Sequence, residues 1–136
     1  MNYWLIKSEP FKYSWENLEK DQTTFWDGVR NYQARNNLKA MKKGDYALFY
    51  HSNEGKEIVG IAQISKEAYP DPTDTDWVLV DVTPFQKFEK TIRLETLKQH
   101  PVLKNMALIR QSRLSVCPVT QEEFEIICTL ANAKIE

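Results

Sequence analysis

Glycine is scarce in this sequence: four of the 136 residues are glycines, which leaves little room for phosphate-binding or dinucleotide-binding loops. The glycine-rich phosphate loop, the dinucleotide fingerprint and the Gly-x-Ser-x-Gly nucleophile motif are all absent. The two cysteines, Cys117 and Cys128, lack a metal-ligand spacing and have no clustered histidines beside them. We therefore expect no metal, no cofactor and no catalytic residue, and we expect two reduced, partly buried thiols.

Long hydrophobic runs are also missing, since no stretch approaches eighteen apolar residues, and the N-terminus has no basic-then-apolar signal. The sequence predicts neither a membrane span nor secretion, and we expect a cytoplasmic protein. A formal net charge of −1 excludes a general polyanion binder, which would be clearly basic. The charge is uneven, however: residues 28–43 carry five Lys or Arg and no acid, whereas residues 67–81 carry five acids and no Lys or Arg. A nucleic acid would therefore bind locally.

The apolar pattern predicts a single α+β domain over residues 1–136, long enough to form a core without disulfides. Long strands with scattered short helices favour a small, curved β-sheet or barrel flanked by helices, and a monomer is the simplest expectation. Strands are predicted over 3–6, 45–51, 58–64, 77–83 and 107–116, and helices after Ser14, in the second half of 24–38, over 95–100 and after Thr120.

The turns between these elements follow from their composition. Residues 52–56 have turn chemistry and predict an antiparallel hairpin between the strands on either side. Gly60 lies inside the second of these strands, which indicates a bulge or a close backbone approach. A loop is expected over 69–76 and a turn over 84–90, and Pro118 is expected to end the last strand.

Residues 24–38 are the most distinctive segment of the chain. They combine the indole of Trp26 with a glycine turn, two guanidiniums (Arg30 and Arg35) and three carboxamides. A flat ring, planar donors and local positive charge suit a planar, anionic ligand such as a nucleotide. The alternative is that Trp26 is a core residue beside a solvated helix face, because large aromatic residues mostly serve cores.

The two histidines are candidates for acid–base chemistry. His100 precedes a proline at a predicted helix end, which is typical of a surface or capping residue. His51 closes a predicted strand beside Ser52 and Asn53, where a neutral imidazole could contact a base edge or act as a general base. The alternative is a strand-end histidine that is bonded to the backbone.

Five segments that are spread over nearly the whole chain carry a family resemblance: Tyr3–Pro10, Trp26–Asn36, Phe49–Asn53, Tyr69–Pro72 and Arg113–Val119. With these segments the sequence closely resembles the EVE domain family. The resemblance implies a PUA-like fold, a compact mixed barrel with flanking helices.

The EVE family is similar in fold to YTH domains, which hold a methylated adenine in an aromatic cage. The YTH pattern begins with Leu-Ile-Lys-Ser, found here at 5–8, and its first cage tryptophan corresponds to Trp26. A second cage aromatic is not matched, and Tyr32, Tyr50 and Trp77 are all open candidates. The resemblance also implies a reader of modified bases in DNA or RNA, cytosine modifications among them.

The sequence therefore predicts a non-enzymatic module that takes one modified base of a nucleic acid into an aromatic-walled pocket. Trp26 would stack on the base, polar side chains at strand ends would contact its edge, and cations would meet flanking phosphates. The expected ligand-binding residues are Lys7, Ser8, Trp26, Asp27, Arg30, Asn31, Tyr50, His51, Ser52, Asn53, Arg113 and Ser115, and the expected phosphate contacts are Arg30, Arg35 and Lys39.

Two other functions remain compatible with the residues. One is an enzyme such as a hydrolase acting on a nucleotide or small metabolite, with His51 or Asp27 as the base. The other is a protein-binding adaptor, which should expose a sizeable apolar patch.

Overall fold

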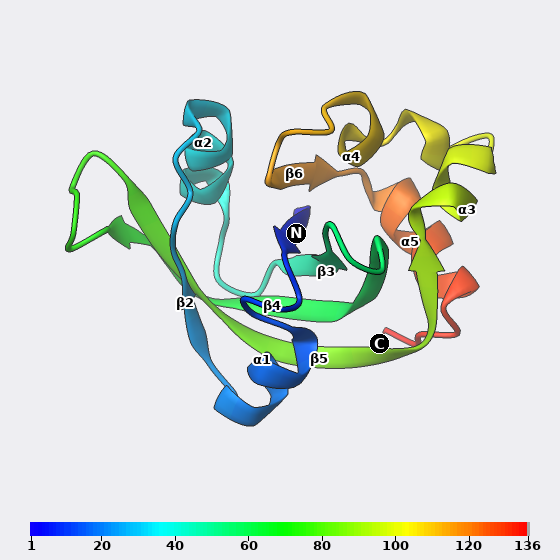
Figure 1. Cartoon of the computed structure of the whole chain (residues 1–136), viewed down its shortest axis with the longest axis horizontal. Coiled ribbons are helices and arrows are strands. Elements are labelled where there is room, and N and C mark those ends of the chain that lie inside the picture. The colour runs from blue at the N-terminus through cyan, green and yellow to red at the C-terminus, as the bar shows by residue number, and fades with distance from the viewer. Residues whose placement is uncertain (136) are drawn as a thin grey trace.

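A computed structural model describes residues 1–135 and shows one mixed β-sheet with helices packed around it (Figure 1). In these residues the elements follow the order β1 (Tyr3–Ser8), α1 (Trp15–Asp21), β2 (Thr24–Trp26), α2 (Tyr32–Ala40), β3 (Tyr46–His51), β4 (Glu57–Pro70), β5 (Val78–Arg93), α3 (Leu94–Gln99), a 3₁₀ turn η1 (Leu103–Asn105), α4 (Ala107–Arg110), β6 (Val116–Val119) and α5 (Gln121–Leu130).

The sheet has the strand order β2-β5-β4-β3-β1-β6. β3 and β1, which lie between β4 and the edge strand β6, form a parallel pair in which Lys7 lies opposite Tyr50 and Ser8 opposite His51. All other pairs are antiparallel, including the β3–β4 hairpin. Because β1 and β3 run in the same direction, their C-terminal ends lie side by side at the same end of the strands. The polar residues of both strands come together at that end.

The central strands are buried on both faces, which explains their nearly continuous apolar sequences. Leu5 and Ile6 of β1 and residues 46–50 of β3 are all buried. The predictions of a strand over 3–6, of a hairpin across 52–56 and of a helix in the second half of 24–38 are therefore confirmed, and Ala34 and Leu38 of that helix are buried. Both cysteines are buried and unpaired, and burial raises the pKa of each thiol to about 11.

The helix starts are set by side-chain caps that the sequence predicts. The Ser14 hydroxyl accepts a hydrogen bond from the backbone N–H of Asn17 at 3.1 Å, and the Asn17 side chain accepts one in return from the Ser14 backbone. Thr120 and Glu123 form the same reciprocal capping box before α5. His100 also acts as a cap, because its Nδ1 accepts from the N–H groups of Val102 and Leu103 before η1.

The predicted barrel is wrong in one respect: in residues 1–135 the sheet is mixed and curved but does not close. Its edges are β2, which has three residues, and β6. The expectation that Pro118 ends a strand is also wrong, because Pro118 lies inside β6. It is exposed there and lacks an N–H group, which suits an edge strand that has no further neighbour.

Three element predictions fail, wholly or in part, in the second half of the chain. The expected turn over 84–90 is part of β5, which pairs with β4 through several register shifts; Pro84 lies at one of them, opposite Ala62, where a missing backbone donor is tolerated. β4 likewise extends into the expected loop over 69–76, because its last residue, Pro70, still pairs with Val78 of β5. The expected strand over 107–116 begins instead with the helical turn α4. Residues 107–110 form that single helical turn, a turn follows over 111–113, and strand structure begins only at Val116.

Candidate functional site

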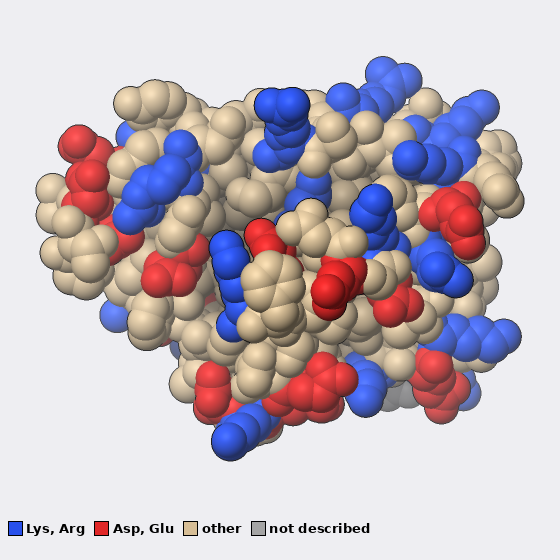
Figure 2. Space-filling view, in the orientation of Figure 1, with Lys and Arg blue, Asp and Glu red and all other residues tan. Residues whose placement is uncertain are grey.

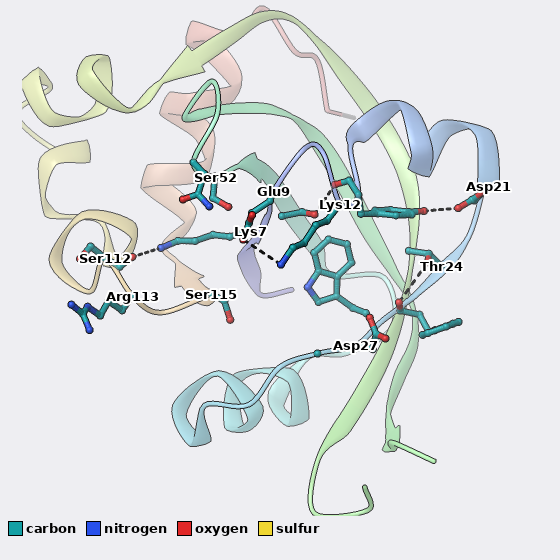
Figure 3. Close-up of a pocket in the computed structure, with 16 residues that line it drawn as sticks. Lys7, Glu9, Lys12, Asp21, Thr24, Asp27, Ser52, Ser112, Arg113 and Ser115 are labelled. Atoms are coloured by element: carbon teal, nitrogen blue, oxygen red, sulfur yellow. Dashed lines mark hydrogen bonds and ion pairs between the residues drawn. The ribbon is translucent and has the colours of Figure 1, made fainter. Parts of the chain in front are cut away.

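A cavity of about 860 Å³ opens at the edge where β1 and β3 end. The backbone N–H of Ser52 donates to the Ser8 carbonyl, and that of Lys7 donates to the Ser115 carbonyl, so three chain segments are joined here. Figure 3 shows the resulting arrangement of labelled side chains. The lining residues are Lys7, Ser8, Glu9, Lys12, Tyr13, Asp21, Thr24, Phe25, Trp26, Asp27, Gly28, Ser52, Asn53, Ser112, Arg113 and Ser115.

Three aromatic residues, Tyr13, Phe25 and Trp26, line this cavity. Trp26 is 8% exposed and is held edge-on between Phe49, with ring centroids 5.6 Å apart, and Tyr13, with centroids 6.3 Å apart. Phe25, in contrast, is 56% exposed. Trp26 is therefore a core residue and a cavity-lining residue at the same time. The sequence left these two interpretations, core residue and ligand-facing aromatic, as alternatives.

The polar groups of the cavity are partly fixed by hydrogen bonds. The Lys7 ammonium donates to the Ser112 carbonyl at 2.8 Å, as Figure 3 shows, and the Ser8 hydroxyl donates to the Tyr13 carbonyl at 2.6 Å. Burial lowers the pKa of Lys7, and the nearby Cys117 opposes this effect. Burial also raises the pKa of Tyr13, whose hydroxyl donates to Asp21. These bonds fix the walls and keep Tyr13 neutral at physiological pH.

Other polar side chains of the cavity are available to a ligand. Within residues 1–135 the side chains of Asp27, Asn53, Arg113 and Ser115 line the cavity and make no hydrogen bond or ion pair. They supply carboxylate and amide oxygens, amide and guanidinium N–H donors, and a hydroxyl. The cavity can therefore both donate to and accept from a planar polar ligand.

Eight of the twelve expected ligand-binding residues line this one cavity: Lys7, Ser8, Trp26, Asp27, Ser52, Asn53, Arg113 and Ser115. The other four lie elsewhere. Tyr50 is buried and His51 faces α1, while Asn31 caps α2 by accepting from the N–H of Ala34. Arg30 is in a separate cluster beside the β4–β5 loop.

His51 is occupied by a structural bond. Its Nε2 atom accepts a hydrogen bond from the backbone N–H of Trp15 at 3.1 Å, which places the ring proton of the neutral form on Nδ1. Burial lowers the pKa of His51, and the carboxylates of Glu16 and Glu57 oppose this effect. This geometry is that of a histidine holding the start of α1, not of a base aimed at a ligand.

The lowered pKa of His51 predicts a pH-dependent stability. A group whose pKa is lower in the folded state stabilises fully above its unfolded pKa, about 6.5, and this contribution is lost as the pH falls below that value. We expect the free energy of unfolding to decrease from about pH 7.5 to about pH 5.5, by less than about 1 kcal/mol because the imidazole is only partly buried. His51→Gln, whose amide oxygen can still accept from Trp15, should lose this decrease. Chemical denaturation at several pH values compares the two proteins, and equal pH slopes would contradict the prediction.

Arg30 and Arg35 belong to a cluster that ties α2 to the loop between β4 and β5. Arg30 forms an ion pair with the buried Asp71 at 3.2 Å, and the Arg35 guanidinium donates to the Asp76 carbonyl at 3.1 Å. Both guanidiniums stack on the ring of Trp77, and Arg35 also covers Tyr32. Hydrogen bonds from Thr73, and then from Arg30, hold the pKa of Asp71 below its usual value.

This cluster changes the charge pattern that the sequence suggests. The acidic residues of the 71–77 loop lie against the cationic residues of α2, so the two oppositely charged runs neutralise each other in part. Tyr32 and Trp77 stack on one another with centroids 5.3 Å apart, outside the cavity, and Tyr50 is buried beneath it. Of the residues expected at phosphates, Lys39 is exposed on α2.

Sequence reasoning missed Tyr13 and Phe25 as wall residues, together with Lys12 and Ser112. Strand alternation gave no signal for Phe25, because neighbouring side chains of a strand point to opposite faces and Trp26 was already expected in the cavity. One signal that was missed is residues 96–121, which hold four Lys or Arg and no acid.

The described residues, 1–135, hold no group of three or more His, Cys, Asp or Glu side chains that could bind a metal ion. None of the helices in that range combines the length and the apolar character that crossing a membrane requires.

The fold and the cavity define a small α+β domain with a mixed sheet and a polar, aromatic-lined recess beside its central parallel strands. The chain belongs to the EVE domain family, whose family model matches residues 2–130. It is 43% identical to thymocyte nuclear protein 1 of Gallus gallus, over 97% of this chain and 69% of that protein.

Two solved structures extend the comparison. The human THYN1 protein in complex with 5-methylcytosine containing DNA is 39% identical, with a TM-score of 0.89, and the match covers 99% of this chain and 100% of that one. The YTH domain of Zygosaccharomyces rouxii MRB1 protein in complex with N6-methyladenosine RNA has a TM-score of 0.62 at 18% identity, covering 99% and 87% of the two chains. The similarity of this chain to the YTH domain is one of fold.

Proposed function

We propose that this protein is a non-enzymatic reader of a modified base in DNA or RNA, and that the base enters the cavity beside Trp26. The observation that carries the proposal is the cavity itself. A volume of about 860 Å³ accommodates a nucleobase with its sugar, and Trp26 provides an aromatic surface that Phe49 and Tyr13 hold in place.

The polar side chains of the cavity suit the edge of a base. Asn53 and Asp27 supply an amide and a carboxylate to the wall of the cavity, and Ser115 and Arg113 add a hydroxyl and a cation. The 5-methylcytosine DNA bound by the human THYN1 protein supports a methylated cytosine as the first base to test.

A base reaches such a cavity only after it leaves its stack. Extrusion from a duplex costs a few kcal/mol, so single strands and damaged pairs are the favoured ligands. The net charge of −1 adds little general attraction to DNA, and the affinity must come from the filled cavity. A methyl group packed against the aromatic wall returns roughly 1–3 kcal/mol.

We therefore expect at least a several-fold preference for one modified base over its parent. The test is a titration of single-stranded oligonucleotides that carry one central 5-methylcytosine, another modified base or the plain parent base. Asn53→Asp should weaken binding and reduce the preference, because it replaces the cavity-lining amide with a carboxylate while keeping a residue that tolerates the left-handed backbone at this position. Gln121→Ala, an exposed change on α5 outside the cavity, is the matched control and should alter neither quantity. Equal affinities for every modified and plain oligonucleotide would overturn the proposal.

A further inference from the structure

The cations of residues 96–121 form a surface that the proposed function leaves unused. This segment comprises the end of α3, η1, α4 and β6, and it contains four Lys or Arg and no acid. We call its exposed side the acid-free face; it is defined by Lys98, Lys104, Arg110 and Arg113, all of which are exposed. Figure 2 shows several Lys and Arg side chains over the upper right of the molecule, where Figure 1 draws α3 and α4, together with an acidic cluster beside α3, where Glu95 precedes the segment.

The packing of this segment directs its cations outward. Leu97, Leu103, Met106 and Leu108 are buried beneath it and anchor the successive turns to the core. Of the four cations only Arg110 has a partner within residues 1–135, the amide oxygen of Asn105, which is neutral. The charges of the acid-free face are therefore not compensated by ion pairs.

The two arginines near the start of α2, Arg30 just before it and Arg35 within it, are already bonded to other residues. Arg30 is paired with Asp71, and Arg35 is bonded to the acidic 71–77 loop and stacked on Trp77. A guanidinium bonded in this way has few N–H donors free for a phosphate, and the carboxylates of the loop repel the negative charge of a phosphate. Within residues 1–135, folding thus engages the two arginines of the first positive region and leaves Lys39 exposed, whereas the four cations of the acid-free face have no acidic partner.

The acid-free face is continuous with the cavity. Ser112 and Arg113 line the cavity, and the same two residues line a second recess of about 270 Å³ together with Asn31, Gln33, Gln111 and Leu114. The bond from Lys7 to the Ser112 carbonyl fixes this junction at the cavity wall. A chain that leaves the cavity past Arg113 thus enters a recess lined by carboxamides and then meets Arg110.

We propose that the nucleic-acid strand on one side of the bound base leaves the cavity past Arg113 and runs over the acid-free face, with its phosphates at Arg110 and Lys104. This inference rests on the proposed function, since it takes the base in the cavity as the starting point of the strand. It places the phosphate contacts on α4 and η1, not on α2.

The experiment compares two double charge reversals with the same change of net charge. Lys104→Glu with Arg110→Glu alters the acid-free face, and Lys39→Glu with Lys42→Glu alters two exposed lysines at the end of α2. Each protein is titrated at several salt concentrations with a single-stranded DNA oligonucleotide that carries one central 5-methylcytosine, and with its unmethylated counterpart. Thermal unfolding verifies that both variants are folded, and Lys104→Gln with Arg110→Gln provides a milder version of the first.

For the acid-free face variants, two lost phosphate contacts should reduce the slope of log affinity against log salt by about 1.4, at roughly 0.7 per contact for single strands. The ratio of affinities for methylated and plain oligonucleotides should not change, because phosphate contacts carry no base information. The α2 variant should keep most of the wild-type slope. An unchanged slope in the acid-free face variants, or an equal loss in both pairs, would overturn the inference. Equal affinities for methylated and plain DNA, with the slope still lost, would instead overturn the proposed modified-base preference and leave the strand path standing.

Discussion

Replacing Trp26 with alanine is expected to abolish binding of the modified base and to lower the free energy of unfolding by about 3–5 kcal/mol. The two losses have different origins. Stacking on an aromatic side chain contributes about 1–3 kcal/mol per base, enough to remove a micromolar complex from the measurable range. The stability loss arises because Trp26 is 8% exposed and packs against Phe49 and Tyr13, so its removal leaves a void beside the core.

The two effects can be separated with neighbouring substitutions. Trp26→Phe keeps an aromatic ring and should retain more stability while weakening the stack. Phe25→Ala removes a cavity-lining ring that is 56% exposed, so it should change the free energy of unfolding by less than about 0.5 kcal/mol. Urea denaturation measures stability, and oligonucleotide titration well below the unfolding temperature measures binding. A Trp26→Ala protein that still preferred the modified base would place the site outside this cavity.

Local chemistry made much of the fold predictable. Ser14 and Thr120 set helix starts through contacts within three residues, and the β3–β4 hairpin follows from turn residues between two apolar runs. The predictions that failed concern elements whose structure depends on partners far away in the sequence. β5 continues through Pro84 because β4 offers a long partner with register shifts, and α4 replaces a strand because its apolar residues fit against β6.

The site residues also fall into two groups: those that local sequence predicts and those that depend on distant partners. Lys7 and Ser8 end β1, and Ser52 and Asn53 directly follow β3. Parallel pairing brings the C-terminal ends of these strands together, so sequence reasoning can predict that their residues meet. The ion pair that Arg30 forms could not be predicted from residues 24–38 alone. Its partner Asp71 is separated from it by β3 and β4 and meets it only when the β4–β5 hairpin folds back on α2.

The second large effect is expected at Gly60, in the bulged part of β4. Adding a Cβ atom there would bring it to 2.9 Å from the carbonyl oxygen of Gln86 and 2.9 Å from Cη2 of Trp15. Neither neighbour can move freely: Gln86 pairs with Ile61 in the sheet, and Trp15 is 1% exposed and packed edge-on against Phe49. Gly60→Ala should therefore lower the free energy of unfolding by about 1–3 kcal/mol, even though alanine lowers the entropy of the unfolded chain and so favours folding.

A double-mutant cycle assigns this cost to its cause. Trp15→Phe removes the outer ring atoms that the new methyl group would meet, so Gly60→Ala should cost less in the Trp15→Phe background than in the wild type. The difference between the two costs is the part of the strain that comes from Trp15, and the remainder comes from the Gln86 carbonyl. Because Trp15 begins α1 directly after Tyr13 and Ser14, strain at this position should also shift the Tyr13 wall of the cavity and weaken ligand binding. Urea denaturation of the four proteins gives the cycle, and a Gly60→Ala protein as stable as the wild type would show that β4 and α1 are not packed as closely as these distances require.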